Sequence, residues 1–200
     1  MSAIHAPMFT VSSSSGYSFI EPFDTLSADW VESGLGNFTV NTGKLEANDW
    51  GTGGSVWHGP TITHALPNIG DFDVTFSGIV ITPETNDLAD YKIILNADSG
   101  ILIEFGFNDA YWNSETSSLI FISKNGNSID ASSTQDGFSG EIQIIRSGST
   151  VIVNKDSVLW YSGSISTDAL SSISITHNMY DSYTTGVCTL DNIELNGTLV

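Results

Sequence analysis

The sequence predicts an all-β protein, an antiparallel β-sandwich built from two sheets. Its 200 residues contain about twelve short segments in which apolar and polar residues alternate, the period of half-buried strands. Gly, Asn, Asp and Ser cluster between these segments at the short spacing typical of sandwiches. No segment has the apolar period of an amphipathic helix longer than about two turns. The length and an apolar content of 40% fit one domain with one core.

The first element is a polar, serine-rich segment over residues 1–18, which predicts a flexible arm before a domain at 19–200. The segment around which the domain is organised follows later in the chain. Strands are predicted over 56–66 and 72–81, and Pro, Asn, Gly and Asp at 67–71 supply a turn between them. We therefore expect these two strands to pair as a half-buried antiparallel hairpin.

Glycine-containing turns at 41–43, 98–100 and 147–149 predict further hairpins. The remaining strands are predicted at 19–23, 38–40, 44–47, 91–96, 101–107, 118–123, 141–146, 150–153, 158–162, 171–177 and 189–195. Trp30, Trp160 and the single cysteine, Cys188, are expected in the core. No pair of cysteines exists that would join two strands covalently.

The net charge of −18, from 23 acidic and 5 basic residues, argues against nucleic acid or an anionic membrane as a partner. A surface with this negative charge suits cations, neutral ligands or a high-salt solvent. No apolar run approaches the ~18 residues of a membrane span, so membrane insertion is not expected. The first residues lack the pattern of a secretory signal. The predicted location is extracellular or on a virion surface, reached after removal of a signal or by cell lysis.

Several short motifs resemble, in their order and spacing, the concanavalin A-like (lectin/glucanase, LamG-type) jelly-roll superfamily. They are Phe23-Asp24 followed by Trp30, and the segments 42–45, 70–74, 144–148 and 190–195. The resemblance covers about residues 19–197 and implies two curved antiparallel sheets, the concave one commonly holding a glycan. Residues 57–72 are also similar, more loosely, to jelly-roll domains of phage tail proteins.

Hydrolases of this superfamily carry two Glu and one Asp alternating on one strand. The nearest segment here, 103–109, provides Glu104 where three acids are needed, and Glu104 is expected to be an exposed strand residue. The four histidines show no metal-ligand spacing and are expected to be structural or surface residues. The sequence therefore predicts a protein that is not an enzyme.

Glycan recognition combines flat aromatic faces with amide, carboxyl and imidazole groups that bind sugar hydroxyls. Such groups occur together at several places in the predicted loops and strand ends. The candidate carbohydrate-binding residues are Trp50, Trp57, His58, Asn108, Asp109, Tyr111, Trp112 and Tyr180. The alternative is that these aromatic residues anchor the core or the loops.

A structural Ca²⁺ ion is the one cofactor that the resemblance implies. The resemblance places Asp191 near Glu21 or Asp24, and carboxylate oxygens are the ligands that Ca²⁺ prefers. The alternative is that these acids are solvated at strand ends and that Asp191 only hydrogen-bonds the backbone.

Two classes of function remain. The first is a non-catalytic carbohydrate-binding or adhesion module whose partner is a glycan or cell-surface polysaccharide. The second is a structural protein of a virus particle, in its tail, spike or capsid, with other virion proteins as partners. A glycan hydrolase or lyase with an unfamiliar site is a third class.

Overall fold

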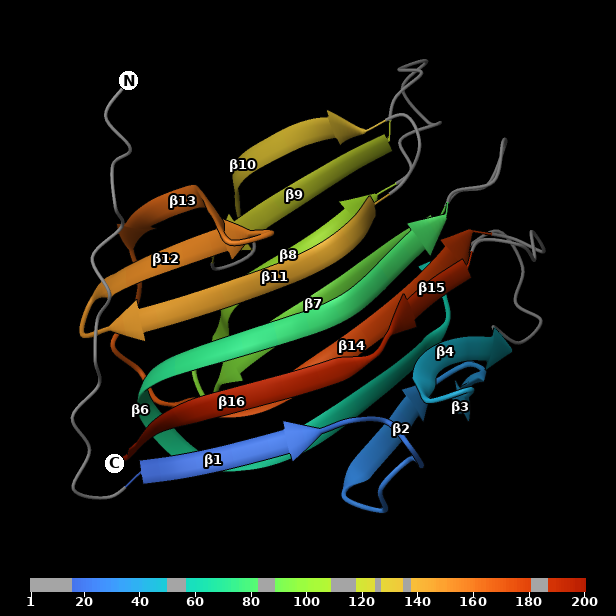
Figure 1. The fold of residues 1–200 in the computed structure, drawn as a ribbon, viewed down its shortest axis with the longest axis horizontal. Coiled ribbons are helices and arrows are strands. Elements are labelled where there is room, and N and C mark those ends of the chain that lie inside the picture. Colours follow the sequence, from blue (N-terminus) through green and yellow to red (C-terminus); the bar gives the residue numbers. More distant parts are fainter. Residues whose placement is uncertain are drawn as a thin grey trace.

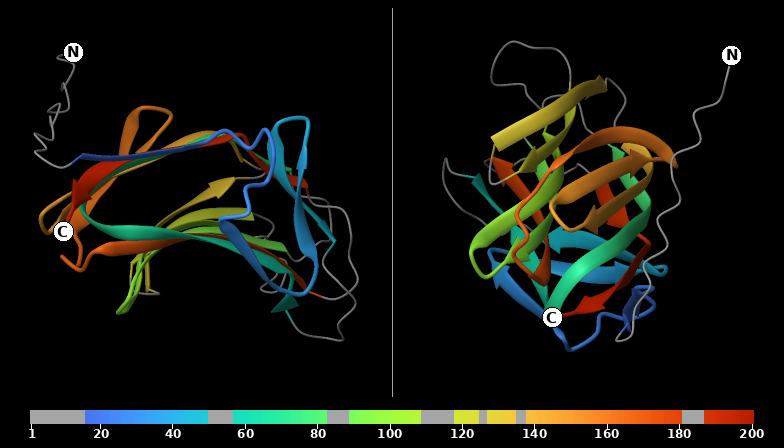
Figure 2. Two further views of the ribbon diagram at one scale, coloured as in Figure 1. Left: turned by 90° about the horizontal axis from the view of Figure 1, so that it is seen from below. Right: turned by 90° about the vertical axis from the view of Figure 1, so that its left-hand side faces the viewer.

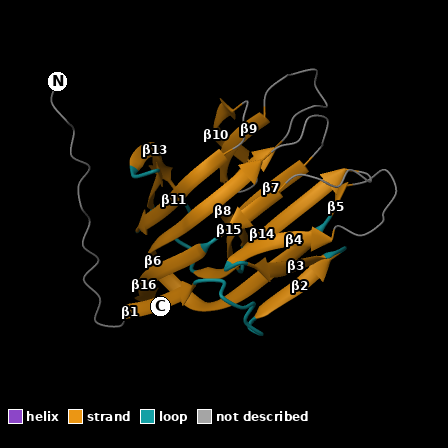
Figure 3. Cartoon of the chain, turned by 45° about the vertical axis from the view of Figure 1, so that its right-hand side comes forward, coloured by secondary structure: helices purple, strands orange, loops and turns teal. Residues whose placement is uncertain are grey.

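The computed structural model describes residues 16–49, 57–82, 89–108, 118–124, 127–134, 138–180 and 187–200. These residues form strands and loops and no helix (Figure 3). The strands lie in two stacked layers (Figure 2), so the predicted all-β antiparallel sandwich is confirmed. No described helix is long and apolar enough to span a membrane.

One layer, which we call sheet I, consists of strands hydrogen-bonded in a single antiparallel order. In that order the strands are β10 (Asn127–Thr134), β9 (Ser118–Lys124), β8 (Gly100–Asn108), β7 (Ala89–Ala97), β14 (Leu170–Tyr180), the first part of β6 (Pro60–Thr82) and β2 (Trp30–Gly34). The short β5 (Trp57–His58) pairs with the end of β14.

The other layer, sheet II, shares β6 with sheet I. Its order is β13 (Val158–Ser164), β12 (Thr150–Lys155), β11 (Phe138–Ser147), the second part of β6, β16 (Asn192–Leu199) and β1 (Gly16–Glu21). The strand that precedes β16 in the chain, β15 (Val187–Leu190), pairs with the end of β6 and with β4 (Lys44–Asp49). β4 also forms a hairpin with β3 (Asn37–Asn41).

The long strand β6 passes from one sheet to the other. Thr61 to Ile69 pair with β14 in sheet I, whereas Phe72 to Ile81 pair with β11 in sheet II. In Figure 1 the strand bends at its left-hand end, where its colour changes from teal to green. The predicted turn at 67–71 is therefore the site of a sheet crossing, and the predicted hairpin between the two halves is wrong. Alternation identifies the buried face of each half but not the strand with which it pairs.

The core fills the space between the sheets, and it is built from the alternating apolar residues of both. Ile62 of β6 and Phe72 of its second half both face this interior and are fully buried. Trp30 and Cys188 are buried and Trp160 packs against the core, as predicted. Because each strand contributes every second residue, the other residues face outwards and are available for other roles.

Several strands differ from the prediction. The strand predicted over 189–195 is two strands, β15 and β16, which are separated at Asp191. β1 begins at Gly16, within the segment assigned to the arm. β2 was not predicted because only its first residue, Trp30, is buried, so no alternation is visible. β10 was not predicted either, since its sequence, NSIDASST, contains few apolar residues.

A buried guanidinium holds the bend of β6 in place. Arg146 of β11 is 1% exposed and faces the interior. Its Nη2 donates hydrogen bonds to the carbonyl oxygens of Ile69, at 3.0 Å, and of Gly70. Its Nη1 donates to the carbonyl oxygens of Asp168 and, at 3.4 Å, of Ser166. One side chain thus ties the bend of β6 to the connection between β13 and β14.

The surroundings of Arg146 are partly apolar and partly acidic. Its guanidinium carbon lies 4.8 Å from the centre of the Phe72 ring, an arrangement typical of a cation–π contact. Burial lowers the pKa of Arg146, while the nearby carboxylates of Asp71 and Asp168 act in the opposite direction. The guanidinium remains charged at neutral pH because it is by far the most basic side-chain group in proteins.

Replacing Arg146 with Met removes these donors and leaves the buried carbonyl group of Ile69 without a partner, whereas the carbonyl groups of Gly70, Ser166 and Asp168 are part-buried and can reach water. An unsatisfied buried group costs about 1–3 kcal/mol, so we expect Arg146→Met to lower the free energy of unfolding by about 1–3 kcal/mol. Urea denaturation measures this change. Lys44→Met, at a half-buried lysine of β4, is the matched control and should change stability by less than about 0.5 kcal/mol. Equal effects of the two substitutions would contradict the role given to Arg146.

A second polar group in the interior predicts how stability depends on pH. His177 of β14 is fully buried, its ring 5.9 Å from that of Tyr91, and burial lowers its pKa to about 4. The unfolded chain takes up this proton near pH 6.5, so the stabilisation from neutral His177 is complete above that pH. As the pH falls from 6.5 towards 4, we expect a loss of about 3 kcal/mol from this group.

His177→Phe removes this titration and should flatten the stability profile between these pH values. Urea denaturation of both proteins at a series of pH values gives the difference directly. Burial also lowers the pKa of His64. Because His64 is present in both proteins, its contribution cancels from the difference between their profiles. Parallel pH profiles for the two proteins would show that His177 does not contribute.

Candidate functional site

The outward side of sheet I carries many polar side chains, which we call the polar face, and Ile94 of β7 lies among them, between Ser174 and Glu104. The polar face includes Thr61 and Thr63 of β6, Ser172, Ser174, Thr176 and Asn178 of β14, Asp90, Lys92 and Asn96 of β7, Glu104 of β8 and Ser123 of β9. These residues occupy neighbouring register positions across the five strands. Each alternates along its strand with residues of the core.

Part of the polar face is buried. Its residues point away from the core, yet Ser174, Thr176, Glu104 and Asp90 are each only 8% exposed. Neighbouring atoms therefore cover these side chains. Sheet I offers a surface of hydroxyl, amide and carboxyl groups that are held close together.

Hydrogen bonds between side chains hold the centre of the polar face in a fixed arrangement. The hydroxyls of Thr63 and Ser174 are 2.9 Å apart, and Asn96 donates from Nδ2 to the Ser174 hydroxyl at 3.1 Å. At the next outward-facing position of the same two strands, the hydroxyls of Thr61 and Thr176 are 3.2 Å apart. The network connects β6, β14 and β7. Its groups have further donor and acceptor capacity for a ligand that carries hydroxyls.

The charged groups of the polar face are engaged with neighbours. Ser123 donates to Oε1 of Glu104 at 2.5 Å, and Lys92 forms an ion pair with Asp90 at 2.6 Å. The expectation that Glu104 is exposed is wrong. Alternation correctly places it on the outward side of β8, but there it is buried and accepts a hydrogen bond from Ser123.

The spacing of the two carboxylates bears on catalysis. Glu104 is opposite Ile94, and Asp90 lies four residues before Ile94 along β7. At about 3.3 Å per residue, the two positions are about 13 Å apart along the strand direction. Pairs of catalytic carboxylates in glycosidases are about 5 to 9.5 Å apart. The positions of Glu104 and Asp90 are therefore farther apart than those of a catalytic pair.

The predicted carbohydrate-binding residues fall into two groups. Trp50, Asp109, Tyr111 and Trp112 lie outside the described residues. The structure places the backbones of four residues at one end of the strands of sheet I, namely Trp57, His58, Asn108 and Tyr180.

The strand register brings this second group together. Trp57 is opposite Tyr180, and His58 is opposite the preceding residue of β14. Asn108 is opposite Asp90, which in turn is opposite Asn178. Residues from three distant parts of the sequence therefore meet where the polar face reaches the end of its strands. Their role in binding stays a prediction.

The predicted calcium site is not formed. Among the described residues, no three His, Cys, Asp or Glu side chains are grouped so that they could hold a metal ion, and Glu21, Asp24 and Asp191 are all described. Glu21 has another role, since its carboxylate accepts hydrogen bonds from the Phe23 amide at 3.1 Å and from the Trp30 indole at 2.9 Å. It thereby links β1 of sheet II to β2 of sheet I.

Asp191 and Asp24 have separate surroundings. The Asp191 backbone N–H donates to the carbonyl oxygen of Ser77 at 3.1 Å, and its side chain lies against Gly78, where a Cβ atom would have no room. Gly78 also has a φ of +64°, which favours glycine. Asp24 is exposed in the loop after β1. Asp191 is also exposed, which agrees with the alternative of a solvated acid at a strand end.

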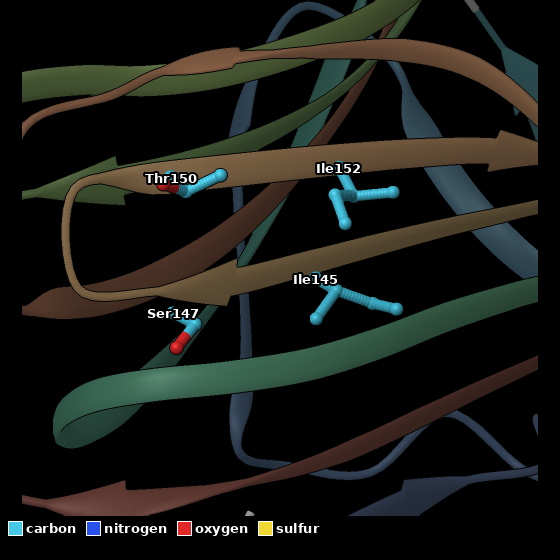
Figure 4. A pocket seen from close by; sticks show the side chains of 4 residues that line it. All are labelled: Ile145, Ser147, Thr150 and Ile152. Atoms are coloured by element: carbon cyan, nitrogen blue, oxygen red, sulfur yellow. The ribbon is translucent and has the colours of Figure 1, made fainter. Parts of the chain in front are cut away.

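Sheet II also has a hollow on its outward side, between β11 and β12. Ile145 and Ile152 lie beside each other there, with the Ser147 and Thr150 side chains at one end (Figure 4). Its volume is about 110 Å³, small for an extended ligand. The hollow provides fewer polar groups than the polar face of sheet I.

Three other polar groups on this side of sheet II are joined to one another. Gln143 donates from Nε2 to Asp73 at 2.9 Å and accepts from Asn154 at 2.9 Å. Burial raises the pKa of Asp73, and the hydrogen bond from Gln143 acts in the opposite direction.

No protein-family model and no curated protein sequence matches the chain. Solved structures do match it in fold. The CBM2 module of the evolved Dit of Lactobacillus casei BL23 phage J-1 has a TM-score of 0.70 at 10% identity, covering 92% of this chain and 97% of that one. The exoplasmic/lumenal domain of VIP36, in its Ca²⁺/Man3GlcNAc-bound form, has a TM-score of 0.60 at 9% identity, covering 92% and 89%.

A prokaryotic β-1,3-1,4-glucanase (lichenase) derived from a mouse hindgut metagenome has a TM-score of 0.59 at 12% identity, covering 89% of this chain and 98% of that one. The matches therefore include a carbohydrate-binding module, a lectin domain and a hydrolase. At these identities the likeness shows the fold. The chain has a concanavalin A-like jelly-roll fold, as the sequence motifs predicted.

Proposed function

We propose that the chain binds a neutral glycan on the polar face of sheet I and does not cleave it. The observation that carries this proposal is the network of hydroxyl and amide groups formed by Thr63, Ser174 and Asn96, fixed across three neighbouring strands. Such groups, already held in place, bind sugar hydroxyls without a further loss of side-chain freedom. The likeness to carbohydrate-binding and lectin domains supports the same class of ligand.

Charge favours a neutral glycan over an acidic polysaccharide. The polar face holds the carboxylates of Asp90 and Glu104 against the single ammonium group of Lys92, and the chain as a whole carries a charge of −18. An anionic chain would approach this surface against repulsion. A neutral polysaccharide on a cell surface is the partner that fits, with the protein acting outside the cell or on a virion.

Absence of cleavage is part of the proposal. The carboxylates of Glu104 and Asp90 occupy positions too far apart to act as an acid and nucleophile on one bond. Each is also engaged with a neighbouring side chain. These two groups suit a role in holding the face in shape.

Blocking the centre of the polar face should abolish glycan binding. Thr63→Arg puts a long cationic side chain there, and we expect the dissociation constant to rise by more than about tenfold. Thr75→Arg is the matched control, because Thr75 is a half-buried, outward threonine of the same strand, in sheet II. A glycan array identifies the ligand, and isothermal titration calorimetry compares the three proteins.

The same mixtures are assayed for new reducing ends and for unsaturated products, and none are expected. Binding that survives Thr63→Arg but is lost in Thr75→Arg would place the site on sheet II. Turnover that disappears in Glu104→Gln would replace the binding function with catalysis.

A second candidate function is that of a structural or adhesion component of a virus particle. The likeness to the CBM2 module of a phage Dit, over nearly the whole of both chains, favours it. The two functions are compatible, because a particle that recognises a host glycan needs a domain that binds it.

Mass spectrometry of particles purified on a density gradient tests this second candidate. We expect peptides of this chain in the particle fraction, in a fixed ratio to the major structural proteins. Recovery only in the soluble fraction would leave glycan binding without a particle.

A further inference from the structure

One aliphatic side chain lies in the middle of the polar face. Ile94 of β7 is opposite Ser174 of β14 on one side and Glu104 of β8 on the other. Along β7, the outward residues before and after it are Lys92 and Asn96. The four nearest outward neighbours of Ile94 on these strands are therefore all polar.

Ile94 does not help to fill the core. The residues on either side of it in the chain, Ile93 and Leu95, are buried in the core, so Ile94 points the opposite way. It is half-buried, and it is not among the described, partly buried apolar residues that pack against the core. An aliphatic group in this position gains free energy when a ligand covers it with apolar surface.

Groups that can bind sugar hydroxyls lie close to Ile94. Asn96 is about 7 Å away along β7. In the described part of the chain the side chain of Asn96 bonds through Nδ2, to Ser172 and Ser174, which leaves its Oδ1 as an acceptor. Thr63, which is half-buried, is on the far side of Ser174, about 10 Å from Ile94 across the sheet. A ligand over Ser174 can thus place an apolar group on Ile94 and hydroxyls on Asn96 and Thr63.

The shape of the apolar group on the protein indicates the shape of its partner on the ligand. Among the described outward side chains of β2, β7, β8, β14 and the first part of β6, none is aromatic, and Tyr91 and Phe105 face the core. Flat aromatic rings suit the extended C–H face of a sugar ring. A single branched aliphatic side chain surrounded by polar groups offers a small contact area, which suits one methyl group.

We infer that the sugar bound at the centre of the polar face carries a methyl group, which lies against Ile94. This inference rests on the proposed glycan binding and names the class of sugar. Two classes of neutral sugar provide such a group, the 6-deoxyhexoses at C6 and the N-acetylhexosamines in their acetyl group. A hexose that has a hydroxyl group at this position would lose hydrogen bonds to water against Ile94 without gaining a partner there.

An NMR titration of the isotope-labelled whole chain with matched pairs of methyl glycosides tests this inference. Two pairs differ only at C6, L-fucose with L-galactose and L-rhamnose with L-mannose, and the third pair is N-acetylglucosamine with glucose. We expect the methyl-bearing member of at least one pair to bind at least about fourfold more tightly than its partner, the effect of moving one methyl group from water to an apolar contact. The pair that shows the preference identifies the class of sugar.

Ile94→Thr shortens this side chain and adds a hydroxyl group, so it should reduce the preference to less than about twofold. Ile152→Thr is the matched control, because Ile152 is a half-buried, outward isoleucine of β12 in sheet II, and this variant should keep the preference. Circular dichroism first establishes that both variants are folded. A nuclear Overhauser effect between the Ile94 side chain and the methyl group of the sugar provides a second measurement.

Equal affinities within all three pairs would overturn the inference. So would a preference that Ile94→Thr leaves unchanged, or the absence of binding by all six glycosides. The glycan array and Thr63→Arg decide separately whether the polar face binds a glycan. Equal affinities in the three pairs, together with loss of glycan binding in Thr63→Arg, would therefore reject the methyl contact and retain the proposed function.

Discussion

The crossing of β6 between the sheets, held by the guanidinium of Arg146, is the constraint on which the rest of the structure depends. One strand sets the register of β14 in sheet I and of β11 and β16 in sheet II. At the bend the carbonyl groups of Ile69 and Gly70 point towards the Arg146 guanidinium. Arg146 supplies several donors from a single planar group, so it reaches the bend and the β13–β14 connection together. The polar face is the outer side of the strands that this bend aligns.

Much of the fold could be predicted from the sequence because local alternation reports which residues face the core. The hairpin at Asn41 to Gly43, for example, is formed as predicted, with positive φ values at Thr42 and Gly43. Pairing partners are a non-local property, however. The alternation in β6 is the same for a hairpin as for a strand crossing between sheets, so the crossing could not be recognised. The role of Arg146 depends on the same crossing and was equally invisible.

The candidate site was harder to predict than the fold. Aromatic residues in loops are noticeable one at a time, whereas Thr63, Ser174 and Asn96 are ordinary residues on separate strands. They become a site only because β14 lies between β6 and β7. The alternation of Ser and Thr with Ile in β14 was a visible signal, but its meaning depended on the neighbouring strands. Glu21 shows the opposite error, since a carboxylate suited to calcium instead binds the Trp30 indole.

The proposed function depends on the outer side of sheet I being the ligand-binding surface. An NMR titration of the isotope-labelled chain with a neutral oligosaccharide that it binds tests this dependence. We expect the largest chemical-shift changes at the outward residues of β14, β7 and the first half of β6, with little change on sheet II. Changes concentrated around Ile145 and Ile152 on β11 and β12, with the amides of β14 unaffected, would contradict it.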